Sequence, residues 1–260
     1  MTSIVAVLSD PATARTCLDA ATVAAAVVPE SEVEAFHARV TPKSQIMISE
    51  EVMTDERRAE LVGLLDKKSQ VLQGIVHEWA AAHSTKNPAV WNEIEGDRVE
   101  EIVAERGKTA DLIVIVRPAE HEGKDALHAA IFETSKPLLL VPPISGSPAP
   151  FGHHMAIAWK DSDQAERAVT ASIPWLKQAE RVSLLLVGNE REPSRSPDDV
   201  LALLDPHGIT AQPRLFDRGE DSVGVRLLRA AHEIGGSHRA LFRSRPLPPT
   251  WVSPPSSLPT

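Results

Sequence analysis

Short apolar runs alternate with longer amphipathic stretches along the first half of the chain. The first run, SIVAVL from Ser3 to Leu8, predicts a buried strand, and the Ala-rich stretch after it carries apolar residues at helical spacing. Later strands are predicted at Glu32 to Val40, Ala89 to Gly96, Asp111 to Val116 and Pro137 to Pro143, with helices between them at 54–79, 97–106 and 126–134. Strands that alternate with helices in this way predict a parallel sheet covered on both faces.

The longest of these helices has one apolar face and one charged face. Thr54 is a candidate N-cap, and Asp55 and Glu56 suit the positive end of the helix dipole. The predicted apolar face comprises Leu61, Leu64, Leu65, Leu72, Ile75, Val76 and Trp79. A helix of this kind buries its apolar face against the sheet and leaves its charged face in water.

A second set of elements follows a short break. Residues 144–152, ISGSPAPFG, are small and rich in Pro and Gly, which is typical of a linker. Beyond them, strands are predicted at His154 to Lys160, Arg181 to Val187 and Ile209 to Asp217, with helices at 161–179, 198–208 and 221–235. The stretch at 219–235 corresponds to the one that begins at Gly96. We therefore predict an α/β protein with two doubly wound, Rossmann-like domains in tandem, at residues 1–143 and 153–235.

The correspondence between the two halves stops after Gly235. The first half continues with Asp-Leu-Ile-Val at this point, whereas the second half gives Gly236-Ser237-His238-Arg239. Written back into codons and read one base later, these residues and Ala240 permit Asp-Leu-Ile-Val, so we interpret residues 236–260 as the product of a frameshift in the gene or in the reported sequence. This Pro- and Ser-rich tail is expected to be poorly ordered or loosely docked. The second domain would then lack its last strands and leave a sheet edge exposed.

Composition and charge exclude several classes of protein. The formal net charge of −9 repels phosphate backbones, and no basic stripe interleaved with aromatic residues is present, so we expect no nucleic-acid partner. No apolar run is long enough to span a bilayer, and no basic region precedes the first apolar stretch, so neither a membrane association nor a signal peptide is expected. The expected location is the cytoplasm. The single Cys17 excludes an internal disulfide and is interpreted as a buried, inert thiol.

The sequence contains no motif for nucleophilic or zinc-dependent hydrolysis. It has no Gly-x-Ser-x-Gly, no His-Glu-x-x-His and no pair of cysteines. His153 and His154 are adjacent in a predicted strand, where neighbouring side chains point to opposite faces, so they are poorly arranged to bind one metal ion. We therefore expect no catalytic residue and no metal site.

Three stretches in this order and spacing resemble the universal stress protein family in its tandem bacterial form. They are EGDRVEEIVAERGKTADLIVIVRP, ETSKPLLLVPP and AIAWKDSDQAERAV. The resemblance implies five parallel strands per domain, a role in the stress response, a dimer and, in many members, ATP bound at the carboxyl ends of the strands. Ligands of doubly wound sheets generally bind there, where the strand order reverses.

The loop expected to hold phosphate departs from the family pattern. In members that bind nucleotide, the fourth strand runs into a loop of Gly, two residues, Gly, nine residues, then Gly and Ser or Thr, whose backbone N–H groups approach the phosphates. The first two glycine positions correspond to Val116 and Ala119 here, with Arg117 and Pro118 between them. Gly123 is the only glycine before Pro137. A β-branched residue and a proline without an N–H predict a degenerate phosphate site.

The resemblance also implies an acidic nucleoside contact at the end of the first strand of each domain. The corresponding positions are Ser9 and Lys160, and an aspartate follows each one, at Asp10 and Asp161. These aspartates, or Ser162, have a simpler interpretation as N-caps of the following helices. Nucleotide contact and helix capping are both kept as hypotheses at this stage.

The leading interpretation is a cytoplasmic stress-response protein without a strong catalytic site and with a degenerate nucleotide site. One alternative is an ATP-binding protein with slow hydrolysis, in which the nucleotide lies against Ser9, Asp10, Val40 and the loop at Arg117. Another is an interaction module that pairs with a second copy, or with another protein, at the open edge of the second domain.

Overall fold

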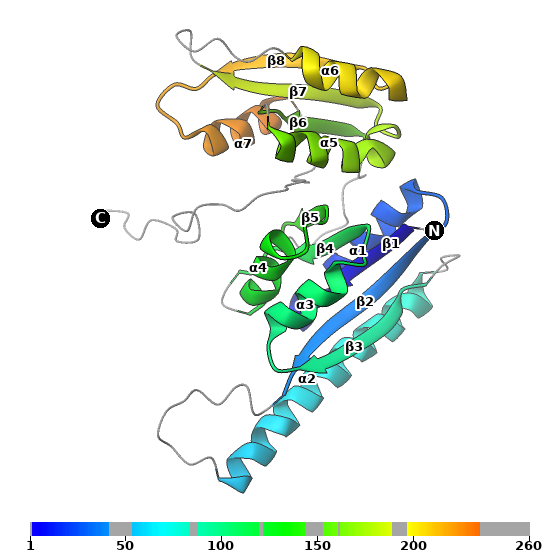
Figure 1. Ribbon diagram of the computed structural model, residues 1–260. Helices are drawn as coiled ribbons and strands as arrows, with labels where there is room; N and C mark the ends of the chain where they lie inside the picture. Colours follow the sequence, from blue (N-terminus) through cyan, green and yellow to red (C-terminus); the bar gives the residue numbers. More distant parts are fainter. Residues whose placement is uncertain are drawn as a thin grey trace.

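The protein folds into two parallel sheets, each with helices on both faces (Figure 1). The computed structural model describes residues 2–41, 54–83, 88–119, 122–143, 153–160, 162–188 and 197–234. One sheet has five strands in the order β3-β2-β1-β4-β5, and the other has three in the order β6-β7-β8. All described strand pairs are parallel. The predicted fold class, two doubly wound parallel-sheet units of which the second is smaller, is confirmed.

The first unit contains the elements β1 to β5. Its strands are β1 (Thr2–Val7), β2 (Ser31–Val40), β3 (Val90–Gly96), β4 (Leu112–Val116) and β5 (Leu138–Val141). Its helices are α1 (Pro11–Val27), α2 (Asp55–Ala82), α3 (Val99–Gly107) and α4 (Lys124–Phe132). Each element lies within a few residues of its predicted position.

The second unit repeats the first six elements of the first unit. Its strands are β6 (His154–Ala158), β7 (Arg181–Gly188) and β8 (Ala211–Asp217). Its helices are α5 (Asp163–Leu176), α6 (Asp198–Leu204), a short 3-10 turn η1 (Asp205–His207) and α7 (Val223–Glu233). The strands β6, β7 and β8 therefore stand in the places of β1, β2 and β3.

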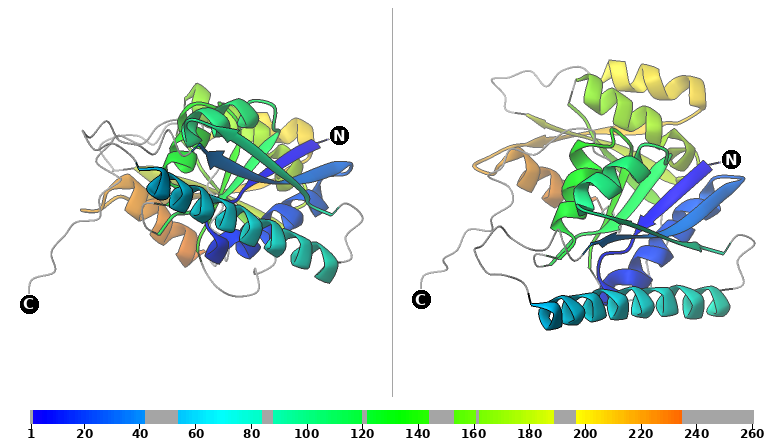
Figure 2. Two further views of the ribbon diagram at one scale, coloured as in Figure 1. Left: turned by 90° about the horizontal axis from the view of Figure 1, so that it is seen from below. Right: turned by 60° about the horizontal axis from the view of Figure 1, so that its bottom comes forward.

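Two separate cores cover the faces of the larger sheet, and the views of Figure 2 show α1 and α2 on one side and α3 and α4 on the other. Successive residues of β1 enter opposite cores, as the period of two along a strand requires. Ile4 and Ala6 pack with α1 and α2, whereas Val5 and Val7 pack with α3 and α4. This arrangement explains why β1 and β4, at the centre of the sheet, appear in the sequence as continuous apolar runs rather than as alternating ones.

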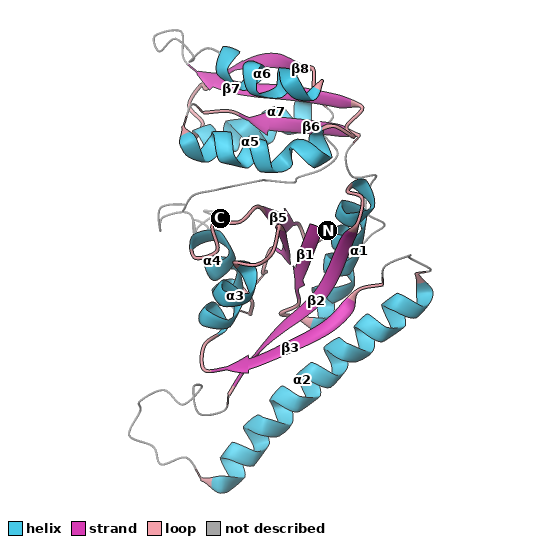
Figure 3. Cartoon of the chain, turned by 45° about the vertical axis from the view of Figure 1, so that its right-hand side comes forward, coloured by secondary structure: helices cyan, strands magenta, loops and turns pink. Residues whose placement is uncertain are grey.

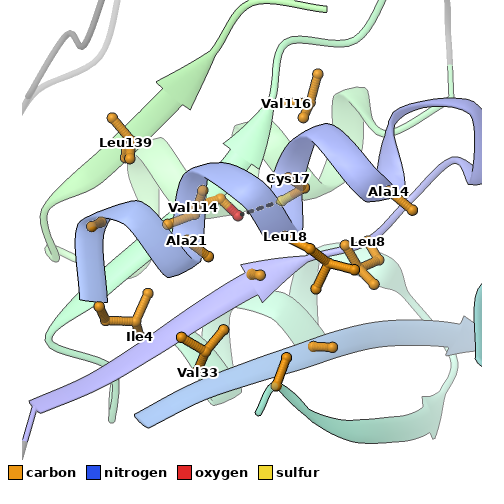
Figure 4. Close-up of a cluster of buried hydrophobic side chains, with 14 of the residues drawn as sticks. Ile4, Leu8, Ala14, Cys17, Leu18, Ala21, Val33, Val114, Val116 and Leu139 are labelled. Atoms are coloured by element: carbon orange, nitrogen blue, oxygen red, sulfur yellow. Dashed lines mark hydrogen bonds between the residues drawn. The ribbon is translucent and has the colours of Figure 1, made fainter. Parts of the chain in front are cut away.

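Helix α1 packs against the centre of the sheet through small side chains (Figure 4). Ala14, Cys17 and Ala21 are almost completely buried there. The Sγ atom of Cys17 lies 3.5 Å from the carbonyl oxygen of Val114, to which it donates. Burial raises the pKa of the Cys17 thiol to about 12, so the thiolate does not form at neutral pH. The interpretation of Cys17 as an inert buried thiol is confirmed.

Helix α2 begins as predicted, since the Thr54 hydroxyl accepts a hydrogen bond from the backbone N–H of Arg57 at 3.2 Å. Its predicted apolar face is only partly buried. Trp79 is 2% exposed, but Leu64 is 57% exposed, so the prediction that Leu64 packs on the sheet was wrong. The physical reason is the position of Leu64 around the helix: helical periodicity places it at the margin of the face that buries Leu72, Val76 and Trp79. Helix α2 also spans about 42 Å, and its first turns extend past the ends of β2 and β3 (Figure 3).

The smaller sheet has its main core on the side of α5 and α6. Leu184 of β7, Ile173 of α5 and Leu204 of α6 are buried in it. Helix α7 lies on the other face against β7 and exposes several of its apolar side chains, with Leu228 52% exposed. The predicted linker at 144–152 and the predicted tail at 236–260 lie outside the described residues, so the proposed domain boundaries stay predictions.

Trp175 of α5 connects the two units. Its side chain is 3% exposed and belongs to the core formed by α1, α2 and the larger sheet. Its indole N–H donates a hydrogen bond of 3.0 Å to the carbonyl oxygen of Ala24 in α1.

In the part of the chain that the structure describes, no helix is long and apolar enough to cross a membrane.

We expect Trp175→Phe to lower the free energy of unfolding by about 1–3 kcal/mol, because it leaves a buried carbonyl without its donor and removes part of a packed ring. Urea unfolding would measure the loss. Trp159→Phe is the matched control, since the Trp159 indole nitrogen is buried without a partner among the described residues. Equal losses in the two variants would contradict the assignment of the Trp175 hydrogen bond as a contact that stabilises the protein.

Candidate functional site

The carboxyl ends of β1, β2 and β4 meet at the point where the strand order of the larger sheet reverses. The chain runs outward from β1 through β2 to β3 and then crosses back to β4, on the other side of β1. Crevices at such a reversal are the usual ligand sites of doubly wound sheets. Two neighbouring cavities lie at this end of the sheet in the structure.

We call them the β1–β4 cavity and the β2 cavity. The β1–β4 cavity has a volume of about 240 Å³ and is lined by Ser9, Asp10, Thr13, Val116, Pro118, Ala119, Glu122 and Gly123. The β2 cavity has a volume of about 220 Å³ and is lined by Ser9, His37, Ala38, Arg39, Val40, Leu65, Lys68, Val99, Glu122, Gly123, Asp125 and Ala126. The two cavities share Ser9, Glu122 and Gly123.

Asp10 uses its carboxylate to cap a helix. Its Oδ1 accepts a hydrogen bond of 2.9 Å from the backbone N–H of Ala12, at the first turn of α1. The N-cap interpretation of Asp10 is therefore confirmed. The same residue also lines the β1–β4 cavity, beside Ser9. The hypothesis that Asp10 contacts a nucleoside stays a prediction.

The loop after β4 gives the β1–β4 cavity an apolar wall. Val116 is 6% exposed, and Pro118 and Ala119 line the cavity with it. Arg117 lines neither cavity, and its backbone N–H donates to the carbonyl oxygen of Val141 at 2.7 Å. The Arg117 N–H is thus already engaged within the sheet, and Pro118 has no N–H.

Among the described residues of this loop, Gly123 has the backbone conformation that favours a glycine. Its φ of +84° lies in the left-handed region, where it forms the N-cap of α4. A Cβ atom at this position would lie 3.1 Å from the Cβ of Ser9. Both the backbone conformation and the close approach to β1 therefore make any larger residue costly here. The sequence had indicated Gly123 only as the single glycine left in the loop.

The charges around the two cavities are mostly acidic or already paired. Among the described residues, Asp10 and Glu122 are the charged ones that line the β1–β4 cavity. In the β2 cavity, the Lys68 ammonium forms an ion pair with Glu122. The Arg39 guanidinium lies 2.5 Å from Asp66 and 3.4 Å from Glu93. Cations that are paired in this way leave little positive charge for a polyphosphate.

His37 is the functional candidate that sequence analysis missed. It is 5% exposed, lines the β2 cavity, and lies with Nδ1 2.8 Å from the carbonyl oxygen of Leu8. A carbonyl can only accept, so Nδ1 carries the proton and Nε2 of the neutral ring is an acceptor. Burial is the main cause that lowers the His37 pKa. The alternation of β2 placed His37 on the same face as Ala35, and this was the available signal.

The candidates of the second unit do not line these cavities. Lys160 is exposed just after β6, and Ser162 caps α5 by accepting from the backbone N–H of Ala165 at 3.3 Å. Asp161 lies outside the described residues. His153 and His154 have different partners, Glu180 at 2.6 Å and Ser183 at 2.9 Å respectively. Within the described ranges, no group of three or more potential ligands could hold a metal ion.

Comparison with known proteins supports the fold. No family model matches the sequence, and no curated protein matches it significantly. A universal stress protein from Archaeoglobus fulgidus DSM 4304 has a similar structure, with a TM-score of 0.62 at 13% identity over 90% of this chain and 84% of the other. A protein from Pseudomonas aeruginosa UCBPP-PA14, provisionally described as a universal stress protein, gives 0.51 at 15% identity over 90% and 80%. The chain therefore has the fold of universal stress proteins.

We expect Gly123→Ala to lower the free energy of unfolding by about 2 kcal/mol, because an alanine pays for the left-handed conformation and crowds Ser9. Gly208→Ala is the matched control, since Gly208 has a φ of +70° but no atom within 4 Å of the added Cβ. It should cost only about 1 kcal/mol. Chemical unfolding of both variants measures the two losses of free energy of unfolding. Equal losses would contradict the claim that a Cβ at position 123 crowds Ser9.

We expect the stability of the protein to fall as the pH drops below 6.5, the ordinary pKa of histidine. The folded protein holds His37 neutral, whereas the unfolded chain binds a proton, so this contribution is complete above pH 6.5 and is lost below it. Urea unfolding between pH 5 and pH 8 measures how the free energy of unfolding changes with pH. This change should be smaller in His37→Asn than in the wild-type protein. An unchanged pH dependence in His37→Asn would contradict the assignment.

Proposed function

We propose that this chain is a cytoplasmic stress-response protein of the universal stress type, which acts by binding rather than by catalysis. We further propose that its two units are the two copies of a tandem pair. The repeated element order and the similarity of the fold to universal stress proteins support this proposal. The observation that carries it is the loop after β4, which stands where a phosphate cradle would have to be.

The residues around the two cavities do not fit a triphosphate. A phosphate site needs backbone N–H groups or free cations directed at the anion. Here Pro118 has no N–H, Arg117 uses its own within the sheet, and Asp10 and Glu122 place negative charge in the β1–β4 cavity. We therefore infer a degenerate nucleotide site.

The same residues do not suggest a catalytic group. Asp10 caps α1, and the Glu122 carboxylate is paired with Lys68. His37 offers an acceptor nitrogen, but no serine or cysteine is hydrogen-bonded to its ring among the described contacts. The ring therefore has no nucleophile to activate among the described contacts. Binding is thus the activity that these cavities support best.

An ATP-binding protein with slow hydrolysis is the second candidate. The position of the cavities at the strand-order reversal favours it, and so does the amino end of α4, which begins at Gly123 beside Ser9. In this alternative the nucleoside lies against Ser9, Asp10 and Val40. The two candidates differ in one measurable property, the affinity of the folded protein for Mg-ATP.

We expect about 5 mM Mg-ATP to leave the thermal midpoint of the wild-type protein unchanged, because a ligand raises the midpoint only if it binds the folded state. Differential scanning fluorimetry measures the midpoint. Glu122→Gln removes one negative charge and frees the Lys68 ammonium, so a rise of about 1–3 °C is expected in this variant with Mg-ATP. Mg-sulfate at the same ionic strength is the control for salt effects.

A clear rise in the wild-type protein would contradict the proposal and favour the ATP-binding alternative. If Mg-ATP raises the thermal midpoint only in Glu122→Gln, the negative charge of Glu122 is what excludes ATP from the wild-type protein. If neither protein responds, the backbone of the loop at Pro118 excludes ATP by itself.

A further inference from the structure

Strand β6 has the position of an inner strand but only one partner among the described strands. Its counterpart β1 pairs with β2 on one side and with β4 on the other. β6 pairs with β7 alone in the described part of the chain. Unpaired backbone groups along such an edge are a template for pairing with another strand.

The ladder between β6 and β7 defines which backbone groups face the free edge. The carbonyl oxygen of His153 accepts from Arg181 N, and the N–H of Trp159 donates to the carbonyl oxygen of Leu185. The odd-numbered residues of this strand therefore direct their backbone N–H and C=O groups toward β7. Because backbone direction alternates along a strand, His154, Ala156 and Ala158 direct their N–H and C=O groups outward.

The other three edges of the two sheets carry features that prevent pairing. β3 contains Glu93 and Glu95, β5 has only four residues and is followed by Pro142, and β8 contains Pro213. Charges, short strands and prolines are the usual protection of an edge. β6, with the sequence HMAIA, has no proline and no Asp, Glu, Lys or Arg.

The chain beyond α7 is chemically a poor partner for this edge. In the first unit, β4 begins five residues after the end of α3, and all five of its residues are buried. The five residues at the same distance after Glu233 are 238–242, HRALF. In a strand covered on both faces, Arg239 would have to be desolvated.

We propose that β6 pairs in antiparallel orientation with β6 of a second copy of this chain, around a two-fold axis at Ala156. In this register Ala156 faces Ala156 of the other copy, and the outward groups of His154 and Ala158 meet each other across the axis. Met155 of one copy lies opposite Ile157 of the other, in the closer type of antiparallel pair. No like charges oppose each other, so the edge is complementary to itself.

Two joined edges of five residues bury much less surface than a standard stable interface, and the dimer is therefore weak, with a Kd of about 10–100 μM. It joins the two small sheets into one continuous sheet. The proposal does not depend on the nucleotide site, because that site lies at the end of the larger sheet.

Sedimentation velocity of the full chain between about 1 and 200 μM tests the proposal, a range chosen to span the expected Kd. The wild-type protein should pass from monomer to dimer. Ala156→Lys or Ala156→Glu alone should weaken the dimer at least about fivefold, because each places two like charges opposite each other on the axis. An equimolar mixture of the two variants should form a heterodimer more tightly than either variant forms a homodimer.

Two further variants separate edge pairing from loss of fold. Ala156→Pro removes an N–H that the β6–β7 ladder does not use, so it should abolish the dimer and keep the wild-type circular dichroism spectrum. Ala156→Ser keeps the N–H and should dimerise as the wild type does. A wild-type protein that stays monomeric at 200 μM, charge variants that dimerise unchanged, or a mixture that forms no tighter heterodimer would each overturn the proposal.

Discussion

An inner strand of a parallel sheet has two rows of backbone N–H and C=O groups, and both rows need hydrogen-bond partners. In the larger sheet β1 obtains them from β2 and β4, and its side chains enter a core on each face. The other elements of the first unit are arranged around this strand: α1 packs closely on it through alanines, and the ligand-type crevice opens where it ends. In the smaller sheet β6 has the same place but has one described partner. This difference is the basis of the proposal that β6 pairs with a second copy of the chain.

The crevice at the end of β1 keeps the geometry of a ligand site while its chemistry has changed. Gly123 still takes a left-handed conformation and brings the start of α4 against Ser9. Next to it, Pro118 has no backbone N–H and Glu122 carries a negative charge. The cavities therefore lie where doubly wound sheets usually bind ligands, and their lining supports the proposal of a degenerate nucleotide site.

The sequence predicted most elements to within a few residues, because buried parallel strands and amphipathic helices leave strong patterns. It also predicted the caps Thr54 and Asp10, since capping is a local hydrogen bond. It failed for Leu64, which lies at the margin of the buried face of α2 and is exposed in the folded protein. It also missed His37, because a polar residue in an alternating strand gains its buried hydrogen bond to Leu8 only after β1 and β2 have paired.

The sequence alone determined the order of the elements and the parallel sheets, because these follow from hydrophobic periodicity over short distances. Only the tertiary structure decided how residues distant in the chain come together. The indole of Trp175 reaches α1 across the boundary between the two units, and Lys68 of α2 meets Glu122 beside the crevice. Such contacts depend on the distances between packed elements, and no local pattern in the sequence encodes those distances.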